Sequence, residues 1–212
     1  MLTLRSAAAK GRNREFSTRE ASVITDVPLA VLNKYISRDL APLGVAVWGD
    51  GKRSLSYQGL IAIRMAYEYP KSLAAASRVE IIQQALRSPR KRHLTLEDGK
   101  VVVRVDTARR FVAAGFQALQ AAESAISVDA DIMSGEPCIK GTRIPAYVVA
   151  DICRSSGADA AKRTYSRLSH QQIAAACQFA LAHPRRGRPK RVRSVLARGK
   201  PVRSRTVSVT ID

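Results

Sequence analysis

Apolar residues recur with helical spacing along most of the chain, and two short stretches alternate instead. Between Leu73 and Leu86 the apolar positions stand three or four residues apart, which is the spacing of one buried helix face. Around the turns at residues 49–51 and 98–99, apolar and polar residues alternate on both sides, a pattern typical of β-hairpins. The patterning therefore predicts a mainly α protein with two short β-hairpins.

Helix boundaries follow from capping signals. Ser17 followed three residues later by Glu20 is a capping-box pattern, and Pro28 suits the first turn of a following helix. With the apolar spacing, these signals predict hairpins over residues 45–55 and 93–105, a strand at 126–128, and helices over residues 18–25, 28–38, 57–69, 71–87, 106–124, 146–155, 158–165 and 169–182.

The order of these elements divides the chain into five predicted parts. Two short helices joined by a tight turn and followed by a hairpin predict a winged helix-turn-helix over residues 16–69. A flexible basic arm, residues 1–15, precedes it, and linking helices with the second hairpin, residues 70–125, follow it. A small three-helix domain, residues 126–184, and an extended basic C-terminal tail, residues 185–212, complete the prediction.

The first module, from Phe16 to Tyr67, resembles the MerR-like winged helix-turn-helix. In that family the second helix lies in the major groove and the wing contacts phosphate. Asparagine and arginine can read adenine and guanine edges through paired hydrogen bonds. An ordinary solvated helix face and an exposed turn are the alternative. The resemblance implies DNA contacts from the second helix and from the wing by Asn33, Lys34, Ser37, Arg38, Lys52 and Arg53.

The chain is strongly basic, with 36 Lys+Arg against 17 Asp+Glu and a formal charge of +19. Such a chain attracts polyanions, because Lys and Arg displace the counterions condensed on a phosphate backbone. DNA binders, ribosomal proteins and membrane-surface proteins all share this property. Residues 185–212 contain ten Lys+Arg and one acid, so the tail supplies +9 of the total. Its glycines and prolines argue against a packed element there.

The most distinctive stretch is the loop over residues 126–145, which reads ISVDADIMSGEPCIKGTRIP. It resembles the family called domain of unknown function 433, whose members carry the pattern G-x-P-x-I-x-G-T-R-I-P followed by three helices. The resemblance covers about residues 126–184. It implies a small helix-turn-helix domain, and many members are antitoxins. After the loop, this chain has Lys162, Arg163 and Arg167 where the family usually has acids.

The loop residues predict a rigid entry into a helix. Gly141 permits a strained backbone angle, Thr142 can hydrogen-bond local amides, and Pro145 sets the helix start. Arg143 is predicted to pair with Asp129 or Asp131 across the loop. Contact of Arg143 with DNA phosphate or with a partner is the alternative. The predicted motif-loop residues are Gly135, Pro137, Gly141, Thr142, Arg143 and Pro145.

The whole arrangement resembles VapB-type antitoxins of the less usual helical class, whose partners are PIN-domain ribonucleases. Such toxins hold a metal ion in an acidic cluster, and guanidinium groups pair well with carboxylates. The resemblance implies that the tail blocks that cluster, while the alternating residues 206–211 add a strand to the toxin's sheet. Alternatively the tail serves DNA, since residues 187–189 look like an AT-hook core, or it does neither. The predicted toxin-binding residues are Arg185, Arg186, Arg188, Lys190, Arg191, Arg193, Arg198, Arg203 and Arg205.

The sequence contains no constellation of catalytic residues. It has no Gly-rich phosphate loop and no His-Glu or Cys-His metal spacing. Cys138, Cys153 and Cys177 form no CxxC pair and are predicted to be reduced structural thiols. No apolar stretch has the length of a membrane helix or a signal peptide. We therefore expect a cytoplasmic, non-catalytic protein without a cofactor, a metal or a membrane partner.

These observations lead to one main hypothesis and two alternatives. The main hypothesis is the antitoxin of a type II toxin–antitoxin system, which neutralises a PIN-domain ribonuclease and represses its own operon by binding double-stranded promoter DNA. Repressors of palindromic sites are usually dimers, so a homodimer or a higher hetero-oligomer with toxin is expected. A stand-alone transcriptional regulator is the alternative. An RNA-associated or structural adaptor ranks third, because only 5% of the chain is aromatic.

Overall fold

The computed structural model describes residues 14–38, 40–49, 52–69, 74–88, 90–96 and 101–185. Within these ranges the chain is mainly helical, with three small sheets of short strands. The α-helices are α2 (Thr18–Thr25), α3 (Leu29–Ser37), α4 (Tyr57–Glu68), α5 (Ala75–Arg87), α6 (Asp106–Ser124), α7 (Ala146–Ser156), α8 (Ala158–Thr164) and α9 (His170–Ala182), with 3-10 turns η1 (Ala41–Leu43) and η2 (Met133–Gly135). The strands are β1 (Phe16–Ser17), β2 (Ala46–Gly49), β3 (Lys52–Leu55), β4 (His93–Leu96), β5 (Val101–Arg104), β6 (Ile126–Ser127) and β7 (Cys138–Ile139).

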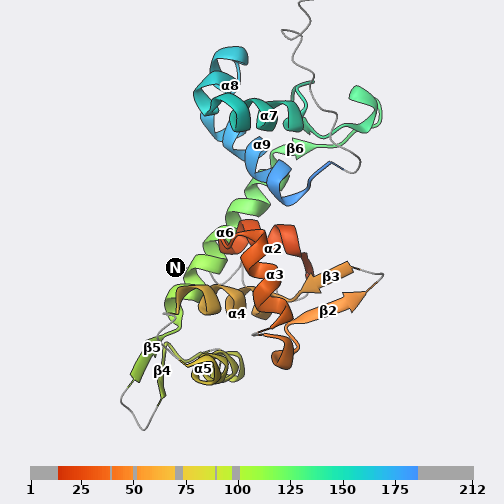
Figure 1. Ribbon diagram of the computed structural model, residues 1–212. Helices are drawn as coiled ribbons and strands as arrows, with labels where there is room; N and C mark the ends of the chain where they lie inside the picture. The colour runs from red at the N-terminus through yellow and green to blue at the C-terminus, as the bar shows by residue number, and fades with distance from the viewer. Residues whose placement is uncertain are drawn as a thin grey trace, which may run out of the picture.

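The long helix α6 is the axis around which the other elements are arranged (Figure 1). Helices α2 and α4 pack against it, and α3 and the β2–β3 hairpin lie on the far side of these two. Helix α5 and the β4–β5 hairpin lie near the N-terminal end of α6, and α7, α8 and α9 lie at its C-terminal end. No helix in the described part of the chain has the length and apolar content needed to cross a membrane.

The first sheet has three strands in the order β1-β3-β2, all antiparallel. The hairpin strands β2 and β3 confirm the prediction for residues 45–55. Strand β1 was not predicted. In it, Phe16 pairs with Leu55 of β3, and both side chains are fully buried. The extended backbone that Ser17 needs as the N-cap of α2 is also suitable for a strand, so the two elements are continuous.

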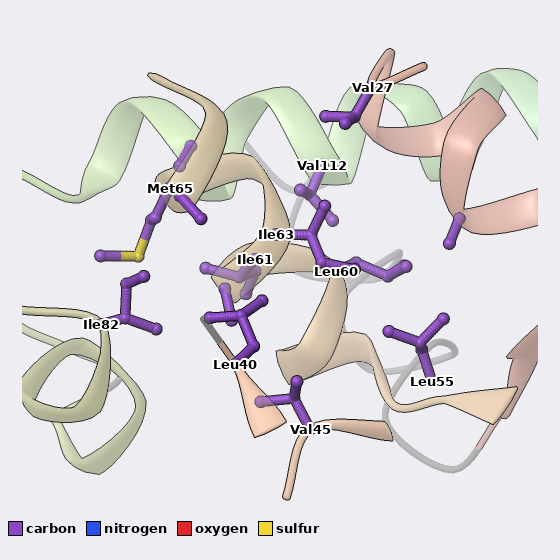
Figure 2. Packing of buried hydrophobic residues seen from close by; sticks show 14 of the residues in the cluster. Val27, Leu40, Val45, Leu55, Leu60, Ile61, Ile63, Met65, Ile82 and Val112 are labelled. Atoms are coloured by element: carbon purple, nitrogen blue, oxygen red, sulfur yellow. The ribbon is translucent and has the colours of Figure 1, made fainter. Parts of the chain in front are cut away.

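The main core lies between α4 and the elements around it. Figure 2 shows Leu60, Ile63 and Met65 of α4 pointing towards neighbours from α5, α6 and the hairpin. Helix α4 is buried on most of its surface, so it is a central helix rather than an amphipathic one at the surface. Phe16 and Tyr57 meet the Phe116 ring edge-on, with centroids 5.4 and 6.0 Å away. This core therefore joins the N-terminal elements to α6.

Arg109 of α6 links this helix to the end of α5 and to the turn before β4. The Arg109 guanidinium donates hydrogen bonds to the carbonyl oxygens of Ala85 at 2.9 Å, Ser88 at 3.1 Å and Lys91. The carbonyl groups at a helix C-terminus lack partners within the helix, and Arg109 supplies them for α5. Arg109 therefore caps α5 and fixes the segment that leads into β4.

The C-terminal helices form a second, smaller core. Ile139, Val149, Leu168 and Ile173 pack together there with three buried alanines. This core does not stand apart, because α9 also packs against α2 and α6, and Ala182 belongs to the main core. The predicted boundary at residue 126 is thus crossed by tertiary contacts.

Most predicted helices agree with the structure to within two residues. The prediction for 18–25 is confirmed with its capping box. The helix predicted from Pro28 begins one residue later, with Pro28 as its N-cap. The helix predicted from residue 71 begins at Ala75, because Ala74 is its N-cap with a non-helical backbone, φ −54° and ψ 145°; residues 70–73 lie outside the described ranges. The predicted basic arm also lies outside them up to residue 13.

Candidate nucleic-acid interface

Helices α2 and α3 are joined by a short, tightly held turn. Asp26 ends α2 in the left-handed conformation, with φ 51°, which Asp adopts more readily than most residues. The Ser22 hydroxyl donates to the Val27 carbonyl at 2.7 Å, and the buried Val27 side chain anchors the turn. Helix α3 therefore leaves α2 in a defined direction.

Helix α3 buries one face and exposes the other. Leu32 and Ile36 are buried, while Lys34, Ser37 and Arg38 are exposed and Asn33 is half-buried. This separation is the one expected from the helical period. Three of the four residues predicted to face DNA from this helix are thus solvent-accessible, and the fourth is partly so.

The hairpin lies beside the C-terminal end of α3. The Arg53 guanidinium of β3 donates to the Ser37 hydroxyl at 3.1 Å, so two predicted DNA-contacting residues that are 16 apart in sequence meet directly. The hydrogen bond places the Arg53 charge next to the exposed residues of α3. Lys52 begins β3 opposite Gly49; its side chain lies outside the described part of the structure. We call Asn33, Lys34, Ser37, Arg38 and Arg53 the α3–wing surface.

The partly buried Arg64 of α4 links this helix to α2 and α6. The Arg64 guanidinium donates to the Thr25 carbonyl at 2.9 Å and to Glu68 at 2.8 Å. It also lies 3.6 Å from the centroid of the Phe111 ring, a cation–π contact. Sequence reasoning missed this residue, because its partners come from three different helices.

The motif loop is built mainly from local hydrogen bonds. The Thr142 hydroxyl donates to the Ile139 carbonyl at 2.8 Å and accepts from the Ile144 amide at 3.1 Å. Gly141 has φ 77°, a conformation that is cheap only for glycine. Helix α7 begins directly after Pro145. The predicted backbone angle of Gly141, the local hydrogen bonds of Thr142 and the helix start at Pro145 are confirmed.

The predicted pairing of Arg143 is not found. Arg143 is exposed, and within the described ranges no carboxylate lies within ion-pairing distance of its guanidinium. Asp129 instead accepts a hydrogen bond from the Asp131 amide at 3.0 Å, a local Asx turn. The loop needs no ion pair, because its polar side chains form hydrogen bonds with its own backbone. Gly135 has φ 77°, and Pro137 accepts from the Ala146 amide at 2.8 Å.

A charged cluster joins the two cores, and the sequence did not reveal it. The Arg14 guanidinium donates to Glu20 at 2.5 Å and to Glu123 at 2.8 and 3.1 Å. The His183 Nε2 atom lies 3.0 Å from Glu123. Arg14 falls within the arm predicted to be free, yet it is half-buried and also lies over the Phe16 ring. The cluster therefore ties Arg14, which precedes β1, to α6 and to the end of α9.

The electrostatics of this cluster favour the ionised carboxylate. Burial raises the pKa of the Glu123 carboxyl, but hydrogen bonds from His183 and Arg14 outweigh burial and lower that pKa from 4.5 to about 2. The hydrogen bond to Glu123 in turn raises the pKa of Arg14. Glu20, Glu123 and His183 offer ligand atoms within 4.8 Å of one another. The Arg14 guanidinium lies among them and supplies the positive charge, so the cluster is complete as an ion-pair network.

Of the predicted toxin-binding residues, only Arg185 falls within the described ranges. It pairs with Glu136 and lies over the Tyr147 ring, 5.0 Å from the centroid. Its guanidinium is thus engaged by the motif loop and α7 of the same chain. The other eight lie at residues 186–205, outside the described part.

The three cysteines are free thiols in apolar surroundings. Cys138 is buried, and Cys153 and Cys177 pack partly against the smaller core. Burial and the neighbouring Cys153 thiol raise the pKa of Cys177 to about 12. Because the thiolate is the reactive form, Cys177 is a poor nucleophile.

The described residues therefore define a mainly helical protein in which a helix pair with a hairpin is joined by α6 to a three-helix unit. Residues 126–180 match the family described as "Protein of unknown function (DUF433)", so the resemblance expected for this segment is confirmed there. The chain is similar to "Uncharacterized protein y4eO" of Sinorhizobium fredii (strain NBRC 101917 / NGR234), with 25% identity over 181 residues, 80% of this chain and 81% of that protein. No solved structure matches the chain.

Proposed function

We propose that the chain binds double-stranded DNA through the α3–wing surface, with α3 in the major groove and the β2–β3 hairpin as the wing of a MerR-like winged helix-turn-helix. The observation that carries the proposal is the meeting of Arg53 with Ser37, next to the exposed Lys34 and Arg38. Arginine and asparagine can read base edges in the major groove, and a cation at the wing suits backbone phosphate. The formal charge of +19 supports a polyanionic partner.

We further propose that this DNA-binding protein is a cytoplasmic antitoxin. The segment that matches DUF433 and the basic residues 186–205 support this role, because arginines complement the acidic metal site of a PIN-domain ribonuclease. The antitoxin would neutralise that toxin and repress its own operon as a homodimer or as a larger complex with toxin. The chain itself would perform no catalysis.

Substitution of the exposed cations of α3 tests the DNA-binding proposal. Lys34→Ala with Arg38→Ala should weaken binding to promoter DNA and reduce the slope of log affinity against log salt by about 2, since each phosphate contact contributes about 0.9. Arg154→Ala with Arg163→Ala is the matched control, because both residues are exposed and belong to α7 and α8. Equal loss in the two double variants would contradict the assignment of the α3–wing surface.

Co-expression with the product of the neighbouring gene tests the antitoxin role. A short PIN-domain ribonuclease should co-purify with the full chain, and deletion of residues 186–212 should abolish protection of the cells from it. If the truncated chain still protects, the tail is not the neutralising segment. A stand-alone regulator predicts instead that the truncation leaves growth unchanged and strongly reduces the salt dependence of DNA binding.

A further inference from the structure

The segment that links the two cores contains a concentration of basic residues outside the α3–wing surface. Residues 87–110 contain eight Lys+Arg and three acids. The described cations with exposed side chains are Arg87, Arg90, Lys91, Arg92, Arg104 and Arg110. We call these six residues the basic hairpin surface. They belong to the end of α5, the turn before β4, strand β5 and the start of α6.

The backbone of this surface is held in place from inside. Arg109 donates to the carbonyl groups of Ala85, Ser88 and Lys91, and the Arg92 carbonyl accepts from the Val105 amide at 2.9 Å. These bonds fix the turn at both ends, while the side chains at residues 90–92 remain exposed. A cation on a fixed backbone loses less conformational entropy on binding than one on a mobile chain.

Intramolecular pairing leaves most of this charge uncompensated. Asp106 pairs with Arg110 at 3.0 Å and with Arg104 at 3.7 Å. Among the described residues, no carboxylate lies within ion-pairing distance of Arg90, Lys91 or Arg92. The positive potential of three adjacent cations is therefore directed to solvent, where it attracts an extended anion.

We infer that the basic hairpin surface binds the phosphate backbone of duplex DNA as a second contact, separate from the α3–wing surface. All six of its members are exposed cations. They suit phosphate better than a protein partner, because the centres of protein interfaces are depleted in charge. Among the described residues of the same segment, Val102 is the large apolar side chain that is exposed, at 60%. In the cell, this contact extends the footprint of the operator complex, a role that rests on the proposed function.

Salt-dependent binding to a random-sequence duplex of about 30 base pairs, three helical turns, tests the inference. Three full-length variants are compared with the wild type by fluorescence anisotropy. The first, Arg90→Ala with Lys91→Ala and Arg92→Ala, removes the exposed turn. The second, Arg154→Ala with Arg163→Ala and Arg167→Ala, removes equal charge from exposed residues of the C-terminal unit. The third, Lys34→Ala with Arg38→Ala, removes the α3 cations.

The turn variant should bind more weakly than the wild type and have a salt slope smaller by up to about 2.7. Between about 50 and 200 mM salt, the affinity of the wild type should then fall about 40-fold more than that of this variant. The control variant should retain most of the slope. Equal slopes for the turn variant and the wild type, or an equal loss in the control, would overturn the inference.

Two further readouts keep the outcome unambiguous. Hydrogen exchange on the unsubstituted chain should show slower exchange of the amides at residues 90–96 when duplex DNA is added; unchanged exchange there would count against the contact. If only the turn variant loses affinity, the basic hairpin surface stands and the α3 assignment fails. If the turn variant binds DNA normally but no longer co-purifies with the neighbouring ribonuclease, the surface serves a protein and the inference is wrong.

Discussion

Gly115 is the position where a methyl group should be most harmful. In an ordinary helix interior, Gly→Ala stabilises by about 1 kcal/mol. Here a Cβ atom at residue 115 of α6 would lie 2.1 Å from the carbonyl oxygen of Ile24 in α2 and 3.0 Å from its carbonyl carbon. A carbon–oxygen contact needs about 3.3 Å, so the two helices would have to separate by about 1.2 Å.

The expected cost of Gly115→Ala follows from these two opposing effects. Overpacking of this kind costs up to about 3 kcal/mol, and the gain in helix propensity offsets about 1 kcal/mol of it. The net destabilisation should be about 2 kcal/mol, which lowers Tm by about 4–8 °C for a chain of this length. Separation of α2 from α6 would also disturb the contact of Phe16 with Phe116, which is 5.4 Å between centroids.

Urea unfolding followed by circular dichroism measures this effect. Ala114→Gly is the matched control, because Ala114 is the exposed neighbour of Gly115 on the same helix; it should cost about 1 kcal/mol from propensity alone. Both substitutions should therefore destabilise the protein, although one adds a methyl group and the other removes one. A Gly115→Ala protein more stable than the wild type would refute the close crossing of α2 and α6.

Three other substitutions probe the charged cluster, the motif loop and the cap of α5. The pKa of the Glu123 carboxyl is lowered from 4.5 to about 2, so the stabilising effect of this carboxylate is complete above pH 4.5 and is lost as the pH falls towards 2. Glu123→Gln should therefore destabilise the protein by about 2 kcal/mol at neutral pH. In urea titrations, the difference in stability between this variant and the wild type should vanish near pH 2. Thr142→Val removes two loop hydrogen bonds and should cost about 1–2 kcal/mol, whereas Thr142→Ser should retain most of the stability. Arg109→Lys cannot reach three carbonyl groups at once, so amides of the β4–β5 hairpin should exchange faster with solvent, and unchanged exchange would contradict the capping role.

The elements that were predicted well are those whose signals are local. The capping box of Ser17 and Glu20 lies within four consecutive residues, and the structure contains both of its hydrogen bonds. The motif loop is likewise closed by hydrogen bonds of Thr142 to residues two and three positions away. Such interactions join residues only a few positions apart and do not depend on the rest of the fold. Residue type and spacing therefore suffice to predict them.

Part of the α3–wing surface was accessible to the same reasoning. Lys34 and Arg38 lie opposite the buried Leu32 and Ile36, as the helical period requires. The contact of Arg53 with Ser37 was not predictable, because it depends on the direction in which the hairpin leaves the helix. The expected pairing of Arg143 was wrong for a local reason. The polar groups of the loop form hydrogen bonds with its own backbone, so the loop needs no ion pair.

Local patterning was therefore enough to establish a mainly helical chain, the boundaries of most helices and the hydrogen-bonded entry into α7. The joining of the two cores was not, because it depends on residues that are distant in sequence. Arg14 meets Glu123 across 109 residues, and His183 meets it across 60. Gly115 is required only because Ile24 crosses it. No period or capping signal encodes such pairs; they form when packing of α2, α6 and α9 brings these side chains together.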